Sequence, residues 1–198
     1  MIIAITGTTS GVGYHLSQIL KQEHNVIELT RDFADLDYPY EITEFGKVDI
    51  LINCAGHDVG GKVPFKDMQW NHWNRVINTN LVSAMRLSQL AIQANENVTV
   101  VNITSTNVDK FYPGDLVYSL SKKSLQIFSD MLRYEHPTVT VKEVILGLTK
   151  TNFNKNRHKE SHKPIDDLYS MDHLSPDEVA DVIARFIFSE NELIRITP

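Results

Sequence analysis

The sequence predicts an α/β fold in which helices cover both faces of a single parallel sheet. Short runs rich in β-branched residues alternate with longer segments of helical hydrophobic period, the pattern of parallel strands joined by crossover helices. The strand-like runs are apolar at consecutive positions, as expected for strands buried on both faces. No segment rich in Pro, Gly or Ser divides the chain. We therefore expect one domain covering residues 1–198.

The individual elements follow from the continuous apolar runs and from the helical hydrophobic period. The expected strands are residues 2–6, 25–30, 48–53, 98–104, 139–145 and 192–197. The expected helices are residues 11–22, 66–94, 115–134 and 175–189. Ser175 followed by Pro176 predicts the N-cap and the first position of the last helix. Residues 152–174 carry the weakest pattern, and a stretch of this length is typical of a substrate lid or a mobile loop.

The amino-acid composition argues against several classes of partner. The formal net charge is −6, whereas proteins that bind nucleic acid present a basic surface to the phosphates. No apolar stretch approaches the roughly 20 residues of a membrane span, and the first residues lack the charged start of a signal peptide. Cys54 is the only cysteine, which excludes an internal disulfide and fits a reducing compartment. We expect a cytoplasmic protein without nucleic-acid or membrane partners.

A glycine-rich turn follows the first expected strand. In ITGTTSGVGYHL, Gly7 permits the tight turn, and Gly11 and Gly13 let backbone approach a pyrophosphate and let the helix pack on the strand. The helix N-terminus presents free N–H groups to the anion, and Thr9 and Ser10 add hydroxyl donors. The turn predicts a dinucleotide site on a Rossmann-type, doubly wound sheet. The alternative is a flavodoxin-like protein that binds no dinucleotide.

The glycine spacing, Thr-Gly-x-x-x-Gly-x-Gly, resembles that of classical short-chain dehydrogenase/reductases. The likeness continues in order along the chain, in NCAG at 53–56, NTNLVSAM at 78–85, NITS at 102–105, YSLSK at 118–122 and LGLTKT at 146–151. The resemblance implies a nicotinamide cofactor and hydride transfer to or from a carbonyl or alcohol. The sequence departs from the family at Leu146, where proline is usual.

The resemblance assigns catalytic roles to Ser105, Tyr118, Lys122 and Asn80. A tyrosine, with an ordinary pKa of about 10, needs a nearby cation to ionise near neutral pH. At about 100° per residue, Lys122 shares the helix face of Tyr118 and Lys123 does not. A ribose contact by the lysine and a water held by the asparagine come from the resemblance alone. Taken singly, the Tyr–Lys pair could be amphipathic, the serine a cap and the asparagine a polar helix residue.

The expected cofactor-binding residues extend beyond the glycine turn. Arg31 ends the second expected strand, where an acid is common in NAD sites and an arginine suits the 2′-phosphate of NADP. NADP(H) is therefore favoured over NAD(H), with a solvated arginine beside Asp32 as the alternative. Asp35 or Leu36 could contact the adenine. The complete expected set is Gly7, Thr9, Ser10, Gly11, Val12, Gly13, Arg31, Asp35, Leu36, Asn53, Ala55, Gly56, Tyr118, Lys122, Thr149 and Thr151.

The connection after the second expected strand is unusually short. The family places a helix and a third strand there, but the four residue steps from Arg31 to Asp35 span at most about 14 Å. A five-residue strand alone is roughly 17 Å long. We therefore expect about six strands, with the family's third strand missing, an irregular loop at 31–37 and a crossover helix near 38–46.

Three further features concern the substrate and possible metals. The basic stretch KNRHKESHK at 155–163 could recognise an anionic substrate, but we favour a solvated, mobile lid. His158 and His162 lie one helical turn apart, yet no carboxylate or cysteine completes a metal site, so we expect no metal. Cys54 stands where the family has Asn, and we interpret it as a small buried residue rather than a nucleophile.

Together these residues predict an NAD(P)H-dependent oxidoreductase acting on a small carbonyl or alcohol, with Tyr118 as general acid and base. One alternative is a non-catalytic NADP-binding sensor on the same fold, which would not need the intact Ser, Tyr and Lys. A dehydratase or epimerase is a third possibility, which the glycine spacing disfavours. The resemblance also implies a homodimer or homotetramer through helices 66–94 and 115–134, with Leu125 and Met131 either at that surface or in the core.

Overall fold

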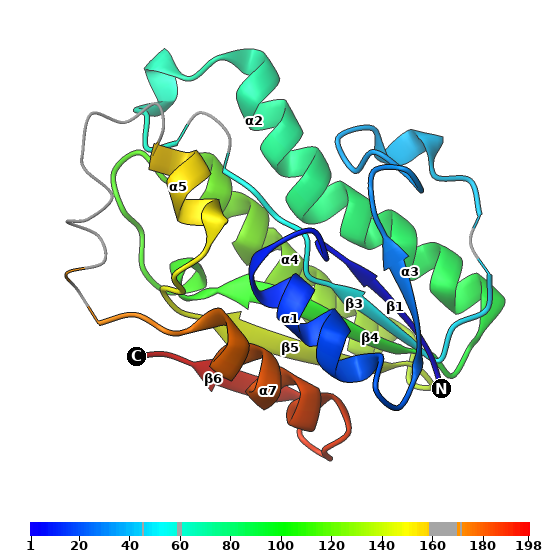
Figure 1. Cartoon of the computed structure of the whole chain (residues 1–198). Helices are drawn as coiled ribbons and strands as arrows, with labels where there is room; N and C mark the ends of the chain where they lie inside the picture. Colours follow the sequence, from blue (N-terminus) through cyan, green and yellow to red (C-terminus); the bar gives the residue numbers. More distant parts are fainter. Residues whose placement is uncertain (45, 59–60, 159–169, 171) are drawn as a thin grey trace.

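The computed structural model describes residues 1–44, 46–58, 61–158, 170 and 172–198, and its strands form one parallel sheet (Figure 1). The strand order within the described residues is β2-β1-β3-β4-β5-β6. Every neighbouring pair of strands is parallel. The bounds are β1 Ile2–Thr6, β2 Asn25–Leu29, β3 Ile50–Asn53, β4 Thr99–Ser105, β5 Thr140–Leu146 and β6 Leu193–Ile196. The expected α/β class and doubly wound sheet are confirmed.

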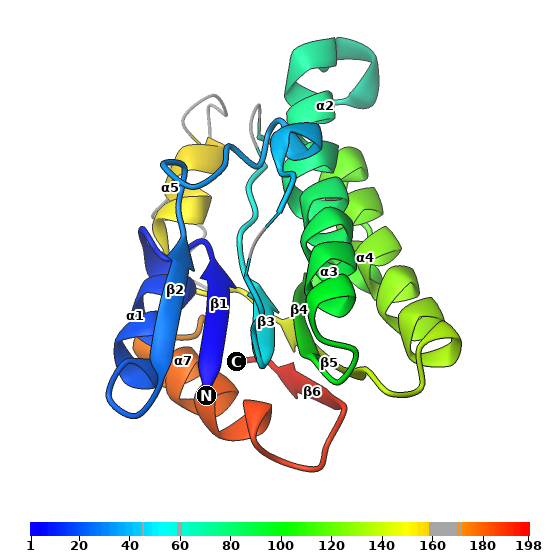
Figure 2. The ribbon, with the colours of Figure 1, turned by 90° about the vertical axis from the view of Figure 1, so that its right-hand side faces the viewer.

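Helices cover both faces of the sheet (Figure 2). The helices on one face are α1 (Gly11–Leu20) and α7 (Pro176–Ile187), and those on the other are α2 (Trp70–Ile77), α3 (Ser83–Ala94) and α4 (Leu116–Glu135). A short helix, α5 (Asn152–His158), lies beyond the carboxyl ends of the strands. It occupies the start of the expected lid, and most of the remainder of that lid lies outside the described residues.

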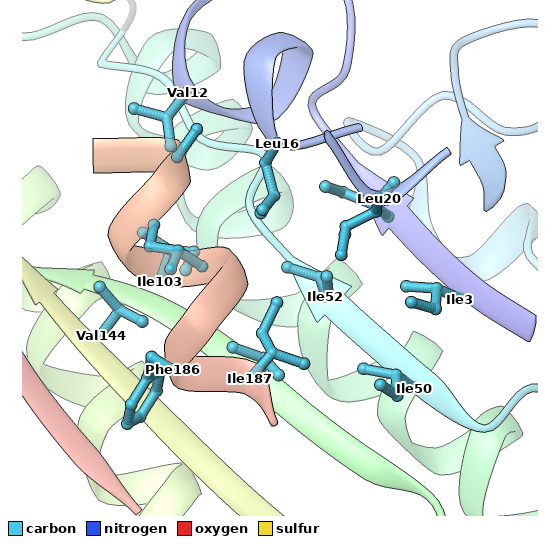
Figure 3. Close-up of a cluster of buried hydrophobic side chains, with 14 of the residues drawn as sticks. Ile3, Val12, Leu16, Leu20, Ile50, Ile52, Ile103, Val144, Phe186 and Ile187 are labelled. Carbon is cyan, nitrogen blue, oxygen red and sulfur yellow. The ribbon is translucent and has the colours of Figure 1, made fainter. Parts of the chain in front are cut away.

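The alternating side chains of each strand supply two hydrophobic cores. Ile3 and Ile5 of β1 pack in the cluster under α1 and α7 (Figure 3), whereas Ala4 between them packs in the cluster under α3. Ile52 and Leu51 of β3 divide in the same way. Because fully burying one such side chain stabilises a fold by roughly 1.5–3 kcal/mol, the continuous apolar runs specify a sheet covered on both faces.

The family has an additional strand outside the second strand, and the expectation that this chain lacks it is confirmed in the described residues. β2 is an edge strand, and residues 31–37 form turns and irregular backbone. The expectation of a crossover α-helix near 38–46 is wrong. The described part of that segment contains one short 3₁₀ turn, η1 (Pro39–Glu41). Pro39 disfavours helical backbone at the residue before it. Ile42 is then buried in the core and its carbonyl accepts a hydrogen bond from Arg86 Nε (2.8 Å) instead of a helical N–H.

The helical segment expected at 66–94 is interrupted. A separate 3₁₀ turn, η2 (Phe65–Asp67), precedes α2, and a π-helical turn, η3 (Asn78–Val82), joins α2 to α3. Single π turns within α-helices are frequent at functional sites. This one contains Asn80, so the irregularity coincides with an expected catalytic residue.

Candidate active site

The glycine-rich turn packs directly on the loop that follows β3. Gly7 has a left-handed φ of +76°, and a Cβ on it would lie 2.9 Å from Ala55 Cα. A Cβ on Gly13 would lie 2.3 Å from the Gly7 carbonyl oxygen. The Thr6 hydroxyl accepts hydrogen bonds from the backbone N–H groups of Cys54 (3.0 Å) and Ala55 (2.9 Å). The turn and the NCAG segment therefore form one rigid unit at the carboxyl edge of the sheet.

The start of α1 has the features of an anion site. Ser10 is its N-cap but makes no side-chain capping hydrogen bond, and Thr9 and Ser10 are exposed. A Cβ on Gly11 would come within 3.2 Å of Thr151 Cγ2, so the 147–151 segment lies against the turn. Buried Thr149 donates to the Gly147 carbonyl oxygen (3.1 Å). The glycines permit these close contacts within the turn, and the free N–H groups at the start of α1 fit a pyrophosphate.

The other expected cofactor residues differ in their surroundings. Arg31 is exposed just after β2, and Asp35 accepts a hydrogen bond from the Asp37 backbone N–H (3.0 Å). Leu36 is half-buried against the core under α3. The side chain of Asn53 is buried and donates to Asn102 Oδ1 (2.9 Å). A cofactor contact from Asn53 therefore has to use its backbone.

Tyr118 and Lys122 share a buried face of α4. Tyr118 is 8% exposed and Lys122 is 5% exposed, and the Lys122 ammonium donates to the Ile103 carbonyl oxygen (2.8 Å). Lys123 is half-buried and donates to Gln126 on its own helix (2.7 Å). The helix geometry thus places Lys122, and not Lys123, on the inward face, as expected from the four-residue spacing.

The π turn brings Asn80 to the same place. Its carboxamide accepts from the His57 backbone N–H (2.9 Å) and donates to the His57 carbonyl oxygen (2.9 Å) and to Ser121 Oγ (3.1 Å). A Cβ on Gly56 would lie 3.3 Å from both Asn80 Oδ1 and Lys122 Nζ. The segments NCAG, NTNLVSAM and YSLSK, which are far apart in the sequence, therefore meet around Gly56.

Ser105, at the end of β4, completes the group. It is buried, and its hydroxyl accepts from the Asn107 backbone N–H (3.2 Å). It caps the short helix η4 (Thr106–Val108), so the capping alternative is also realised. Burial raises the pKa of Tyr118, and a hydrogen bond between Ser105 and the Tyr118 hydroxyl opposes that rise. The two hydroxyls expected to hold a substrate oxygen are thus adjacent.

The ionisation of these side chains is governed by burial. Burial raises the pKa of Tyr118 above its ordinary value, and Ser105 and Arg157 oppose that shift. Burial also lowers the pKa of Lys122 to about 8. Cys54 is half-buried against the core under α1 and α7 rather than fully buried as expected. Desolvation raises the pKa of its thiol to about 11, which disfavours a thiolate nucleophile.

The structure contains a buried ion-pair cluster beside Tyr118 that the sequence did not predict. Arg157 of α5 pairs through Nε with Asp58 Oδ2 (2.7 Å) and through Nη2 with Asp115 Oδ1 (2.5 Å). We expected residues 155–163 to be solvated, but Arg157 is buried, because two carboxylates from other segments neutralise it. Residues 159–163 lie outside the described part. No local signal marks the arginine, since a basic run alone usually indicates a solvated surface.

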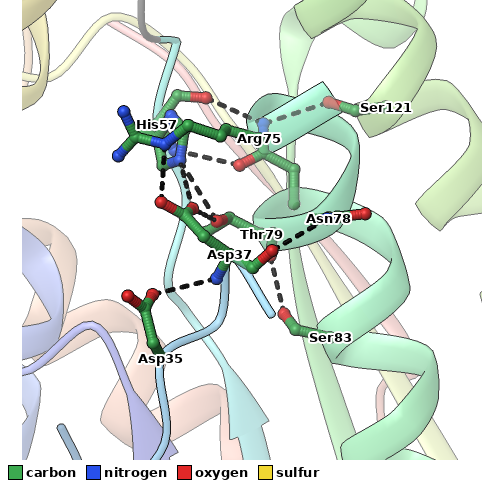
Figure 4. A network of polar contacts seen from close by, with 9 residues as sticks. Asp35, Asp37, His57, Arg75, Asn78, Thr79, Ser83 and Ser121 are labelled. Atoms are coloured by element: carbon green, nitrogen blue, oxygen red, sulfur yellow. Dashed lines mark hydrogen bonds and ion pairs between the residues drawn. The ribbon is translucent and has the colours of Figure 1, made fainter. Parts of the chain in front are cut away.

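A second unpredicted network links the irregular loop to the π turn (Figure 4). Buried Asp37 accepts hydrogen bonds from Arg75 Nε (2.6 Å) and Thr79 Oγ1 (2.5 Å), and the His57 ring lies 3.2 Å from its Oδ1. Burial acts to raise the pKa of Asp37, but the hydrogen bonds from His57, Thr79 and Arg75 outweigh it and hold that pKa well below its usual range. The network fixes His57, and hence the backbone that Asn80 contacts.

Within the described residues, no group of three or more His, Cys, Asp or Glu side chains is arranged to hold a metal ion. None of the helices in the described part is both long and apolar enough to cross a membrane. The side chains of His158 and His162 lie outside this description.

Comparisons with known proteins agree with this geometry. The family model described as short chain dehydrogenase matches residues 38–162. An acetoacetyl-CoA reductase from Allochromatium vinosum is 31% identical over 151 residues, covering 73% of this chain and 61% of the relative. An NADP-dependent 3-hydroxy acid dehydrogenase from Schizosaccharomyces pombe is 28% identical over 174 residues, covering 82% of this chain and 67% of the relative. The chain therefore spans about 61–67% of the length of these two relatives.

Solved structures show the same fold. The closed form of serine dehydrogenase complexed with NADP+ has a TM-score of 0.82 at 22% identity, covering 99% of this chain and 94% of that chain. A short-chain dehydrogenase from Sphingobium yanoikuyae in complex with NADPH has a TM-score of 0.77 at 19% identity, covering 100% of this chain and 87% of that chain. With the family match over most of its length, the chain belongs to the short chain dehydrogenase family.

Proposed function

We propose that the protein is an NADP(H)-dependent oxidoreductase that transfers a hydride between the nicotinamide and a small carbonyl or alcohol substrate. The observation that carries this proposal is the convergence of Ser105, Tyr118 and Lys122 with Asn80 beside the glycine-rich turn. The carboxyl edge of a parallel sheet is where such folds bind ligands. The bound nicotinamide supplies the hydride.

The remaining chemistry falls to the side chains. Tyr118 donates its phenolic proton to the carbonyl oxygen during reduction and recovers it during oxidation. The Ser105 hydroxyl, adjacent to the phenol, holds the same oxygen by a hydrogen bond. Lys122 and Asn80 both face Gly56, and Lys122 would bond the nicotinamide ribose. Burial keeps bulk water from competing for the proton.

The cofactor would bind across the turn and the neighbouring loops. The pyrophosphate would bind the backbone N–H groups of the turn that Gly7, Gly11 and Gly13 shape, with the exposed hydroxyls of Thr9 and Ser10 beside it. The rest of the proposed set, by side chain or backbone, is Val12, Arg31, Asp35, Leu36, Asn53, Ala55, Gly56, Thr149 and Thr151. Arg31 is exposed at the carboxyl end of β2, where it would pair with a 2′-phosphate. The names of the NADP-dependent relative and of the NADP-bound neighbours support this choice.

The substrate class is narrowed by the relatives alone. Two of them are named as an acetoacetyl-CoA reductase and a 3-hydroxy acid dehydrogenase. We therefore place 3-oxo acids, 3-hydroxy acids and acetoacetyl-CoA first in a substrate panel. The test is the change in reduced-nicotinamide absorbance with each compound and each cofactor. Turnover with NADPH supports the proposal, and tight NADPH binding without turnover on a broad carbonyl panel would favour the sensor alternative.

We also propose a cytoplasmic homodimer or homotetramer that associates through α4. This helix exposes Leu116, Leu120, Ile127 and Met131 along its length. Leu125 is 1% exposed and belongs to the core, so of the two residues considered from the sequence only Met131, at 62% exposure, is available for the surface. Such a row of apolar side chains on one helix is typical of an interface between subunits.

A further inference from the structure

Helix α5 contacts Tyr118 through two side chains one turn apart. The Arg157 guanidinium carbon lies 5.2 Å from the centroid of the Tyr118 ring, within the range of a cation–π contact. The Phe153 ring packs 5.5 Å from the same ring, centroid to centroid. The seated position of α5 therefore decides whether a cation and an aromatic ring cover the proposed acid–base group.

The Arg157 side chain is held in place from two directions. Asp58 follows the NCAG segment, Asp115 immediately precedes α4, and both carboxylates are only 1% exposed where they pair with the guanidinium. The backbone is also close, because a Cβ on Gly61 would lie 2.1 Å from the Arg157 carbonyl oxygen. The loop after β3, the start of α4 and α5 thus converge on one cation.

The charges around the phenol act in opposite directions. Besides the Ser105 hydroxyl, Arg157 favours the phenolate, whereas Asp58 and Asp115 favour the neutral phenol. Burial raises the pKa of Asp58 to about 6, although Arg157 opposes that rise.

The other titratable side chains nearby contact groups other than the phenol. Lys122, from the same helix as the phenol, donates to the Ile103 carbonyl oxygen (2.8 Å). Lys62 lies 3.6 Å from Asp115 Oδ2. The His57 ring faces Asp37 (3.2 Å). Among the described residues, the guanidinium over the ring is therefore the cation best placed to act on the phenol.

We propose that Arg157 is a positioning residue for Tyr118, which places a buried cation over the phenol when α5 is seated and so helps the phenol release its proton. This rests on the proposed role of Tyr118 as general acid and base. The physical reason is that a cation in a poorly solvated site stabilises a nearby anion far more than it would in water. Arg157 thereby ties the acid–base step to the docking of α5.

The test is a direct titration of the phenol that needs no turnover. A polyfluorinated tyrosine at position 118 is more acidic than tyrosine, which brings the titration into the range where the protein is folded, and phenolate absorbance is read against pH. The titration is repeated with Arg157→Gln, Arg157→Lys and Asp58→Asn. The matched control is Arg133→Gln, which breaks an ion pair with Asp130 at the other end of α4 (2.8 Å).

We expect Arg157→Gln to lower the phenolate fraction about tenfold below the midpoint, equivalent to a one-unit rise in pKa. Asp58→Asn should move the midpoint in the opposite direction, and Arg157→Lys should restore most of the wild-type value. A role limited to holding α5 would make the glutamine and asparagine variants shift alike. Equal shifts, or a glutamine variant that titrates like the Arg133→Gln control, overturn the proposal.

If Arg157→Gln does not fold, the lysine and asparagine variants still test the proposal. Arg157→Lys should then titrate near the wild-type midpoint, and Asp58→Asn should titrate below it. A lysine variant whose midpoint rises by about one unit contradicts the proposal. The titration is also independent of catalysis. If no substrate is ever turned over but the midpoints shift as expected, the proposed function fails and the charge relationship stands. If turnover is found and the midpoints do not shift, the proposed function stands and the role of Arg157 fails.

Discussion

The side-chain amide of Asn80 pairs with both polar groups of the His57 backbone, accepting from its N–H and donating to its carbonyl over 2.9 Å each. The π turn therefore holds the loop after β3 in the way that a neighbouring strand would. Gly56 precedes His57, and its α-carbon faces the Asn80 oxygen and the Lys122 ammonium. Together with the Asp37 network around the His57 ring, this carboxamide holds the loop that borders the proposed active site.

Replacing Asn80 with alanine should destabilise the fold and lower activity together. The variant leaves the part-buried N–H and carbonyl of His57 without their Asn80 partner, and an unsatisfied buried group costs about 1–3 kcal/mol. The free energy of unfolding measured with urea should fall by about that amount. The matched control is Asn97→Ala, because Asn97 is exposed in the turn between α3 and β4. Equal stability of the two variants would contradict the structural role of Asn80.

Tyr118→Phe should abolish turnover while leaving NADPH binding nearly intact, because the ring stays and only the hydroxyl is lost. General acid–base groups contribute typically 10²–10⁴-fold, so the rate constant should fall by at least about 10². Steady-state kinetics and a fluorescence titration of NADPH measure the two effects separately. Tyr134→Phe is the control, since Tyr134 lies on the same helix and is 92% exposed. A Tyr118→Phe enzyme that keeps most of its turnover would remove the phenol from the mechanism.

Arg31→Ala should weaken NADPH binding and leave NADH binding nearly unchanged. A hydrogen-bonded charge pair with phosphate contributes about 1.5–3 kcal/mol, which corresponds to roughly 10–150-fold in the dissociation constant. Fluorescence titration of both cofactors with both proteins measures the effect. Arg185→Ala is the control, because this arginine is exposed on α7. If the wild-type protein binds NADH more tightly than NADPH, or if the variant keeps the wild-type preference, Arg31 does not determine a preference for NADPH.

Asp37→Asn should remove stability that is present near neutral pH and lost in acid. The pKa of Asp37 is depressed in the folded state, so its carboxylate stabilises the fold above its unfolded pKa of about 3.9 and loses that effect as the pH falls below this value. The difference in unfolding free energy between wild type and variant should therefore be large at neutral pH and shrink below pH ~4. Urea unfolding across this range measures it. Asp32→Asn, at an exposed position, is the control. A difference for Asp37→Asn that stays constant with pH would contradict the network.

A charge on the exposed face of α4 should dissociate the assembly. Met131→Asp places a carboxylate in the proposed apolar interface, where burying it without a partner is strongly unfavourable. Light scattering should show a dimer or tetramer for the wild-type protein and a monomer for the variant. Tyr40→Asp is the control, since Tyr40 is an exposed aromatic residue away from this helix. A wild-type monomer at micromolar concentration would refute the interface.

Local patterns in the sequence were sufficient for several features of this protein. The strands follow from short, continuous apolar runs, and the glycine-rich turn follows from glycine spacing. The choice of Lys122 over Lys123 follows from the helical period of 3.6 residues. The absence of a third strand follows from chain length, because the segment after Arg31 is too short to cross the sheet and return. These properties depend on residues close together in the chain, which a single sequence displays directly.

The tertiary structure alone decided which polar side chains meet. Arg157 belongs to a basic run that reads as solvated, yet it is buried because Asp58 and Asp115 come from distant segments to neutralise it. Asp37 is likewise buried against Arg75, and Leu125 rather than Met131 enters the core. Burial of a charge is favourable only when its partners are present. Those partners are set by how the sheet and helices pack, which no local pattern records.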